Sequence, residues 1–386
     1  MNRVWFSCFT AYHLFNSIYY STKVDWGKDC ERTLIWVNDT RININVDVFS
    51  SCFDKIIKID SLRDMSFLNK QVAKCKNGGR LFNGSVLGKE LSRRFDKSVL
   101  VCFSDQHYIT NKLVNKFKTL ENSNVVIVEE GVATYVTNEV YNPPFSTKAG
   151  NLLFGLHSQR YVGENPNIDT FIVKDPDRLP QEKVLDRKVI KQNNMFCDRE
   201  WINELLGKYV KKTNDFNGSK PVLLWIGQPL EGNYLDVSEE EKIRVRIFER
   251  LAAKYQLLVK THPGERPDKY DGLKPEVSIV DFGEFSWFPI EVLASMIKPQ
   301  IIVTPMSSAA YNIYQTGFEG KILFCYKLFG IDIGQDYFAE LEKKRNIYNV
   351  KDMDELESVL SLDDLSIEVS EVLNNDDLGF FHDLMI

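Results

Sequence analysis

Short apolar runs rich in β-branched residues recur along the first half of this chain, and stretches with helical spacing lie between them. The runs are Val4–Cys8, Thr33–Val37, Lys55–Ile59, Ser98–Phe103 and Val125–Val128. Helices are expected over Tyr12–Ser21, Ser61–Cys75, Ser85–Phe95 and Asn111–Phe117. Because parallel strands need a crossover connection, this alternation predicts an α/β fold with a mostly parallel sheet covered by helices.

The same pattern starts again in the second half. Between Asn142 and Arg178 the sequence is less regular, and the polar segment Asn214–Lys220 suits a domain boundary. Strands are then expected at Pro221–Ile226, Tyr255–Lys260, Val277–Val280, Gln300–Val303 and Lys321–Cys325, with helices at Asp198–Val210, Glu239–Lys254, Pro289–Ile297, Ser307–Thr316, Met353–Leu360 and Ile367–Leu373. A chain of 386 residues suits two cores. We therefore predict two Rossmann-like domains, 1–213 and 214–386, with the last helices packing back on the first domain.

Composition indicates a cytoplasmic protein. Apolar residues make up 44% and charged residues 26%, as in ordinary soluble domains. The seven cysteines form no CxxC pair, which favours reduced thiols. The N-terminus lacks a basic leader and a cleavage site, and no apolar run approaches the roughly 20 residues that span a bilayer.

Charge is unevenly distributed. From Asp352 to Ile386 every charged side chain is acidic, whereas Lys70–Lys97 is rich in lysine and arginine. The basic segment is either a solvated helical face or a surface for an anionic acceptor or for anionic headgroups of the inner membrane. The net charge of −6 and the lack of a nucleic-acid-binding motif argue against a nucleic-acid partner.

Two carboxylates and a glycine, Glu129-Glu130-Gly131, end the fifth apolar run. Strand ends are where open α/β sheets present side chains to a ligand, and glycine permits close approach of the backbone. A partly desolvated carboxylate there could take a proton from an acceptor hydroxyl. The alternative is a pair of solvated residues at the start of a loop.

His262-Pro263 has a similar setting. Pro263 lacks the N–H of a strand, so the chain is expected to turn at His262, one of only five histidines. A histidine there could hydrogen-bond and protonate a departing phosphate, or it could simply cap a turn. His13, in the first predicted helix, is a weaker candidate.

Ser307-Ser308 opens a predicted helix after a buried strand. The unpaired N–H groups of a first helical turn attract phosphate, although plain N-capping also explains one serine. Upstream, Glu291 lies in the first turn of another predicted helix, where it could accept hydrogen bonds from ribose or merely complement the helix dipole. A base, an acid and an anion site together indicate group transfer from a phosphate-activated donor.

In this order the motifs resemble those of the bacterial sialyltransferases of GT-B fold, which include lipooligosaccharide sialyltransferases and capsular polysialyltransferases. That family's pattern is an acidic-acidic-Gly motif, then His-Pro, then Ser-Ser or Ser-Thr. Here these are Glu129–Gly131, His262–Pro263 and Ser307–Ser308, and Phe288–Tyr314 is similar to the family's nucleotide-binding stretch. The resemblance implies two Rossmann-like domains facing across a cleft. It covers the fold and about four short motifs.

The resemblance also implies roles. Glu129 would be the general base with Glu130 supporting it, although glutamate at both positions leaves the choice open. His262 would donate to the phosphate of CMP, which Ser307 and Ser308 would hold. The remaining nucleotide-binding residues would be Gly227, Gln228, Pro263 and Glu291. No cofactor or metal is implied, and the Asp-x-Asp matches at Asp175–Asp177 and Asp352–Asp354 are interpreted as structural.

The expected function is therefore inverting transfer of sialic acid from CMP-sialic acid to a glycan acceptor, which could be anionic, of a capsule or lipooligosaccharide. Peripheral contact with the inner membrane or with capsule-assembly proteins is a further expectation. The alternatives are transfer of another CMP-activated acid sugar (Kdo or a legionaminic-type sugar), a GT-B-fold UDP-sugar epimerase and a non-catalytic subunit of glycan assembly.

Overall fold

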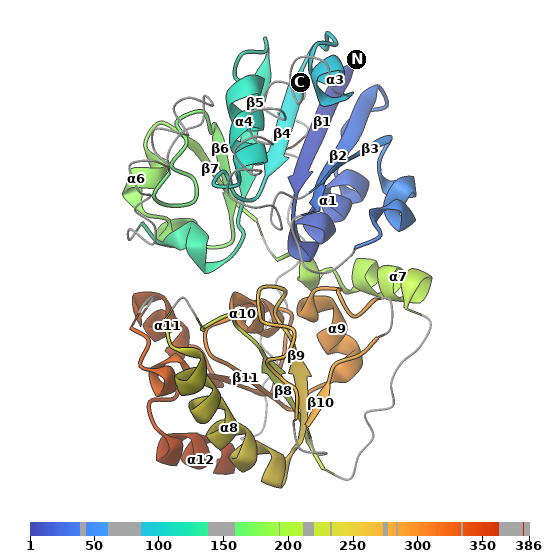
Figure 1. The fold of residues 1–386 in the computed structure, drawn as a ribbon. Helices are drawn as coiled ribbons and strands as arrows, with labels where there is room; N and C mark the ends of the chain where they lie inside the picture. The colour runs from blue at the N-terminus through green and yellow to red at the C-terminus, as the bar shows by residue number, and fades with distance from the viewer. Residues whose placement is uncertain are drawn as a thin grey trace. The chain divides into compact units, whose positions relative to one another are not determined.

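The computed structural model describes residues 1–38, 44–60, 86–137, 159–192, 194–210, 220–231, 234–272, 277–282, 285–332, 335–362 and 381. The chain divides into two compact units (Figure 1). Unit 1 comprises Met1–Asn193 and Asp376–Ile386, and unit 2 comprises Asn194–Asn375. Each unit is built on its own sheet, and in both sheets every strand pair is parallel.

The sheet of unit 1 has seven strands in the order β3-β2-β1-β4-β5-β6-β7. They are β1 (Asn2–Cys8), β2 (Cys30–Asn38), β3 (Lys55–Asp60), β4 (Ser98–Cys102), β5 (Ser123–Val128), β6 (Thr170–Val173) and β7 (Lys188–Lys191). The five predicted strands are confirmed. β6 and β7 were missed because both lie in the stretch that reads as irregular.

Both faces of this sheet are covered. Successive residues of β1 point to opposite faces. Trp5 packs edge-on against Phe117 of α4 (Tyr108–Phe117), whereas Phe6 contacts Trp26 and Phe53. The other regular helices and turns of unit 1 are α1 (Ala11–Lys23), η1 (Val46–Cys52), α3 (Val86–Leu91), η2 (Val132–Tyr135), η3 (Pro176–Arg178) and α6 (Gln181–Val184).

Unit 2 has a six-stranded sheet in the order β10-β9-β8-β11-β12-β13. The strands are β8 (Val222–Ile226), β9 (Gln256–Lys260), β10 (Val277–Ile279), β11 (Ile301–Thr304), β12 (Lys321–Phe324) and β13 (Ile347–Asn349). Its helices and turns are η4 (Met195–Cys197), α7 (Arg199–Tyr209), α8 (Val237–Lys254), α9 (Ile290–Ile297), α10 (Ser308–Gln315), η6 (Tyr326–Phe329), α11 (Gln335–Glu342) and α12 (Met353–Ser361). The sequence predicted all of these strands except β13, and it missed α11.

The strand order places a switch point in each sheet, between β1 and β4 in unit 1 and between β8 and β11 in unit 2. In open α/β sheets, ligands bind at the carboxyl ends of the strands next to such a point. The acidic motif follows β5, the His-Pro motif follows β9 and the serine pair follows β11. The fold therefore puts all three motifs at carboxyl ends of strands.

The boundary between the units differs from the expected 213/214. Residues from Asn194 onward belong to unit 2 because they bond to α10 and the turn after it. Asn194 donates to the carbonyl of Asn312, and the guanidinium of Arg199 donates to the carbonyl of Thr316. Of the segment expected to pack back on the first domain, Phe381 is described, and its ring lies against Tyr20 and Trp26 of unit 1.

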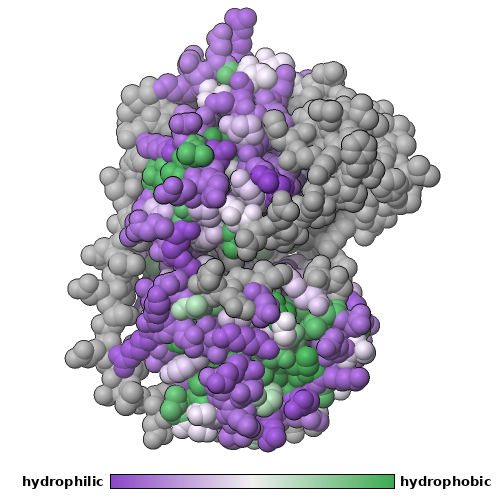
Figure 2. Space-filling view, turned by 90° about the vertical axis from the view of Figure 1, so that its left-hand side faces the viewer, coloured by the Kyte–Doolittle hydropathy of each residue, from purple (hydrophilic) through white to green (hydrophobic). Residues whose placement is uncertain are grey.

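Several predictions fall outside the described residues. They are the helices at 61–75 and 367–373, residues 142–158 of the less regular stretch, most of the basic segment Lys70–Lys97 and most of the linker before Lys220. Among the described helices, none has the length and apolar character needed to cross a membrane. Free cysteines are Cys8, Cys30, Cys52, Cys102, Cys197 and Cys325. On the face shown in Figure 2, hydrophilic residues surround the hydrophobic ones.

Candidate functional site

Glu129, the first residue after β5, is held by buried partners. Its side chain is 7% exposed, and one carboxylate oxygen lies 3.0 Å from Nζ of Lys174. The other oxygen accepts hydrogen bonds from the Tyr135 hydroxyl and, at 2.8 Å, from the backbone N–H of Lys174. Burial and the neighbouring Glu129 raise the pKa of the Tyr135 phenol, so this hydroxyl remains a donor. Glu129 therefore fixes the turn after β5 to the segment after β6.

Glu130 points to different partners and is more accessible. Its side chain is 29% exposed, and Oε1 lies 3.1 Å from Nε2 of His13 in α1. Its backbone N–H donates to Oγ1 of Thr134. Gly131 follows with φ 145°, a conformation that glycine adopts much more readily than other residues. The turn thus sends two adjacent carboxylates into different environments.

His13 was only a weak candidate in the sequence, yet it contacts the acidic motif. Its ring is fully buried and stacks on Phe103 at 4.7 Å with an interplanar angle of 8°. Nδ1 has no hydrogen-bond partner among the residues that the structure describes, so the ring proton of the neutral form belongs on Nε2, which then donates to Glu130. A buried, stacked histidine that donates one hydrogen bond fixes the direction of the Glu130 carboxylate.

The Asp-x-Asp matches have structural roles. Asp352 caps α12, since Oδ1 accepts the backbone N–H of Glu355 at 2.8 Å. Asp175 precedes η3, and its carboxylate lies 3.6 Å from the guanidinium of Arg178. The interpretation of Asp352–Asp354 as the first turn of a helix is confirmed, whereas Asp175–Asp177, expected in an irregular stretch, lies at the start of a short 3-10 turn.

In unit 2, a threonine joins the serine motif to the strand beside it. Oγ1 of Thr304, the last residue of β11, donates to the carbonyl of Ile226 at the end of β8. The same oxygen accepts the N–H of Ser307 at 3.1 Å. Ser307 is the N-cap of α10, because its Oγ accepts the N–H of Ala309, and Ser308 is the first residue of that helix. The start of α10 is thereby fixed next to Gly227.

His262 follows β9 and is held in one tautomer. Nδ1 accepts the backbone N–H of Gly264 at 2.9 Å, so the neutral ring carries its proton on Nε2. Burial, together with the positive charges of Lys269 and Lys260, lowers the pKa of the imidazole to about 4. At neutral pH, His262 is therefore an uncharged donor. The expectation of a histidine at a strand tip is confirmed, and the ring is not a preformed imidazolium.

Glu291 in the first turn of α9 is 8% exposed and accepts a 2.9 Å hydrogen bond from the side-chain amide of Asn312 in α10. It lines a cavity of about 700 Å³, whose other walls come from η4, α7, the segment between α9 and β11, α10 and the turn before β12. His262, Ser307 and Gly227 do not line this cavity. Beside Glu291, Lys260 donates to the carbonyl of Ser286, and burial lowers its pKa to about 8.

The sequence of this chain matches one protein family. The family model for alpha-2,8-polysialyltransferase matches residues 6–316. The chain belongs to the alpha-2,8-polysialyltransferase family. The matched range contains all three motifs, and membership of this family implies sialyltransferase activity and hence a glycosyltransferase. No curated protein matches the chain.

Solved structures show that this member of the polysialyltransferase family has the GT-B fold of glycosyltransferases and epimerases. A putative UDP-N-acetylglucosamine 2-epimerase from Listeria monocytogenes is similar with a TM-score of 0.55 and 12% identity, covering 99% of this chain and 90% of that chain. The UDP-GlcNAc 2-epimerase of Methanocaldococcus jannaschii gives 0.54 and 10% identity, over 93% and 92% of the two chains. A variant of the wall teichoic acid polymerase TagF gives 0.50 and 12%, over 100% and 87%.

Proposed function

We propose that this protein is an inverting, metal-independent sialyltransferase that moves sialic acid from CMP-sialic acid to a hydroxyl of a cell-surface glycan. The observation that carries the proposal is the family match over residues 6–316, which spans the acidic, His-Pro and Ser-Ser motifs. Each of these motifs lies at the carboxyl end of a strand, where such sheets bind ligands.

Unit 2 binds the donor in this proposal. The Nε2–H of His262 donates to the phosphate of CMP, and Ser307 and Ser308 at the start of α10 hold the same phosphate. Glu291 binds the ribose, and the backbone at Gly227, Gln228 and Pro263 borders the nucleotide. Hydrogen-bond donors and a helix N-terminus stabilise the charge that develops on the leaving phosphate without a metal ion.

Unit 1 supplies the base, and we assign that role to Glu130 rather than Glu129. Glu129 is buried between Lys174 and Tyr135, which stabilise its charge and occupy its oxygens. Glu130 is more exposed and is oriented by His13. It takes the proton of the acceptor hydroxyl while the hydroxyl oxygen bonds to the anomeric carbon of sialic acid. The bond from that carbon to the CMP phosphate breaks from the opposite face, so the configuration inverts.

We propose the cytoplasmic face of the membrane as the site of action, with a capsule or lipooligosaccharide glycan as the acceptor. Contact with the membrane or with capsule-assembly proteins would use the basic segment Lys70–Lys97. A liposome-binding assay across salt concentrations tests this, since electrostatic attraction to anionic lipid is screened by salt.

The experiment is incubation with CMP-sialic acid and a panel of lactose, sialyllactose and oligosialic acid, in the presence of EDTA, with products read by mass. CMP-Kdo serves as the competing donor. Transfer of sialic acid supports the proposal. A preference for CMP-Kdo would identify Kdo, and not sialic acid, as the sugar that is transferred. If the protein binds UDP and neither binds CMP nor releases it from a CMP-sugar, an epimerase is indicated instead.

A further inference from the structure

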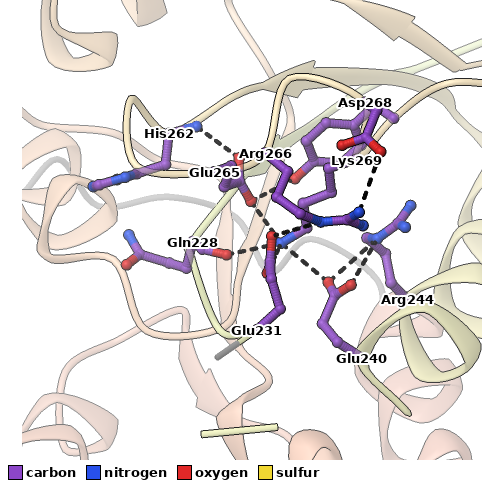
Figure 3. Close-up of polar contacts among 10 residues, drawn as sticks. Gln228, Glu231, Glu240, Arg244, His262, Glu265, Arg266, Asp268 and Lys269 are labelled. Atoms are coloured by element: carbon purple, nitrogen blue, oxygen red, sulfur yellow. Dashed lines mark hydrogen bonds and ion pairs between the residues drawn. The ribbon is translucent and has the colours of Figure 1, made fainter. Parts of the chain in front are cut away.

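Behind His262 lies a buried cluster of acidic side chains centred on Lys269 (Figure 3). The ammonium of Lys269 is 2.8 Å from a carboxylate oxygen of Glu265, 2.9 Å from one of Glu231 and 3.1 Å from one of Glu240. It also donates to the carbonyl of Gln228 at 2.9 Å. None of these four charged side chains is more than 7% exposed. Burial alone would lower the pKa of Lys269, but Glu265 and the other carboxylates more than offset it, so the pKa is raised and the group stays a cation.

The cluster joins two loops that follow neighbouring strands. Gln228 and Glu231 belong to the loop after β8, whereas Glu265 and Lys269 belong to the loop after β9. Lys269 therefore binds the carbonyl of Gln228 and the carboxylate of Glu231 in the loop after β8. It also binds the carboxylate of Glu265 in its own loop. Buried ion pairs are weak evidence for stability, but they can specify one geometry because a misplaced partner leaves an uncompensated charge.

The carboxylate of Glu265 links this cluster to His262. Glu265 accepts the backbone N–H of His262 at 2.7 Å and the hydroxyl of Tyr270 at 2.9 Å while it pairs with Lys269. In Figure 3 the side chains of His262 and Gln228 project away from the cluster to the same side. The backbone of His262 is thus fixed from behind, and its ring faces away.

Gly227, which follows β8, packs directly against Glu265 and Tyr270. A Cβ added at Gly227 would lie 2.5 Å from Oε2 of Glu265 and 2.7 Å from the hydroxyl of Tyr270, both closer than real contacts allow. A side chain at position 227 would therefore displace the carboxylate of Glu265 and the hydroxyl of Tyr270. Both strand ends border Glu265.

We propose that Lys269 is a positioning residue, which through Glu265 and Gln228 locks the loops after β8 and β9 so that His262 presents Nε2–H to the donor phosphate. This rests on the proposed function for the identity of the phosphate. Lys269 acts through other groups and does not itself contact the substrate. Its removal would take the nearest cation from the buried carboxylates of Glu265 and Glu231, so both loops would rearrange, whereas Glu240 would keep Arg244 at 3.3 Å.

The test uses the full chain with ¹⁵N-labelled histidine. Ring nitrogen shifts report the tautomer of each of the five histidines, and His262→Gln assigns the signal of His262. In the wild type we expect a single tautomer protonated at Nε2. Lys269→Met is expected to give a mixture of tautomers and to lower kcat/KM for CMP-sialic acid on the order of 100-fold, as displacement of a catalytic group by about 1 Å does.

The matched control is Glu240→Gln. It removes one charge from the same cluster, but Glu240 lies in α8 and pairs with Lys269 and with Arg244, whose guanidinium lies over the ring of Tyr270, so it does not itself bond either loop. We expect this variant to keep the single tautomer and a kcat/KM close to that of the wild type. If Lys269→Met does not fold, Glu265→Gln, which keeps the shape of the side chain, carries the same prediction of mixed tautomers and lower activity.

A folded Lys269→Met or Glu265→Gln protein with an unchanged tautomer and unchanged kcat/KM overturns the proposal. Equal losses in Glu240→Gln also overturn it, because the cluster would then act only on stability. If the wild type does not turn over CMP-sialic acid, the proposed function fails, while the tautomer measurement still decides whether Lys269 positions His262.

Discussion

Nε2 of His13 lies 3.1 Å from Oε1 of Glu130, and this contact separates the roles of two adjacent carboxylates. His13 is buried and stacked, so it directs Glu130, which remains 29% exposed. Glu129 is directed instead toward Lys174. One glutamate of the motif is thus partly accessible, and the other is buried in an ion pair.

Glu130→Gln is therefore expected to lower kcat for sialyl transfer by about 10²–10⁴-fold, because a positioned general base contributes that much. The free energy of unfolding should change little, since the side chain is partly exposed. Steady-state kinetics and urea unfolding measure the two effects. Glu129→Gln is the matched control, with a smaller loss of kcat in the folded protein and a larger loss of stability. The opposite ranking of kcat would identify Glu129 as the base.

Lys174→Met should destabilise unit 1 by about 3–5 kcal/mol, because it leaves the buried carboxylate of Glu129 without its cation. The double variant Lys174→Met/Glu129→Gln removes both charges and should recover much of this loss. Urea unfolding of the single and double variants measures the coupling. Additive effects of the two substitutions would show that the ion pair contributes little.

His262 makes stability depend on pH. Its pKa is about 4 in the folded protein, against 6.5 for a histidine exposed to water, so the unfolded chain binds the proton more tightly. The favourable contribution is complete above pH 6.5 and is lost as pH falls toward 4, by about 3 kcal/mol in total. In His262→Gln, the free energy of unfolding should fall less between about pH 7 and about pH 4.5 than in the wild type. Parallel curves for both proteins would contradict the lowered pKa.

Gly227→Ala tests the fit at the end of β8. The added methyl group would force Glu265 and Tyr270 to move, and such overpacking typically costs about 1–3 kcal/mol. We also expect weaker CMP binding in calorimetric titration, because the loop after β9 shifts with Glu265. Gly207→Ala in α7 is the control, since nothing lies within 4 Å of its added Cβ. Equal changes in stability and in CMP affinity in the two variants would contradict a steric clash at Gly227.

Thr304→Val should loosen the start of α10. The hydroxyl of Thr304 joins the carbonyl of Ile226 to the N–H of Ser307, and both groups are buried. Loss of the hydroxyl leaves them unsatisfied, which costs about 1–3 kcal/mol. If Ser307 holds the donor phosphate, the Kd for CMP should also rise. A stable variant with unchanged CMP binding would show that the link is dispensable.

Much of the architecture could be predicted from local patterns. The long apolar strands, such as β1 and β5, and amphipathic α8 are visible because their periodicity extends over many residues. β6, β7 and β13 have only three or four residues. Length alone does not explain these misses, because β10, β11 and β12 are equally short and were predicted. β6 and β7 lie in a stretch that reads as irregular, where pairing with strands distant in sequence decides the structure.

The candidate site, too, was predictable from the sequence only where a local pattern marks it. The motifs at Glu129, His262 and Ser307 could be found because strand ends are marked by local chemistry. His13 was missed as a partner because it lies 117 residues from Glu130. Lys269 and Glu240 were not singled out in the sequence, since burial of a charge depends on partners that only the fold brings together.

By itself the sequence determined two repeated α/β units, the position of each motif at a strand end and the family to which the chain belongs. The tertiary structure decided which glutamate is exposed, which tautomer His262 adopts and which cation joins its loop to Gly227. The physical reason is that strand and helix formation depend on residues near in sequence, whereas burial, hydrogen bonding and ion pairing depend on groups that approach only after the sheets have formed.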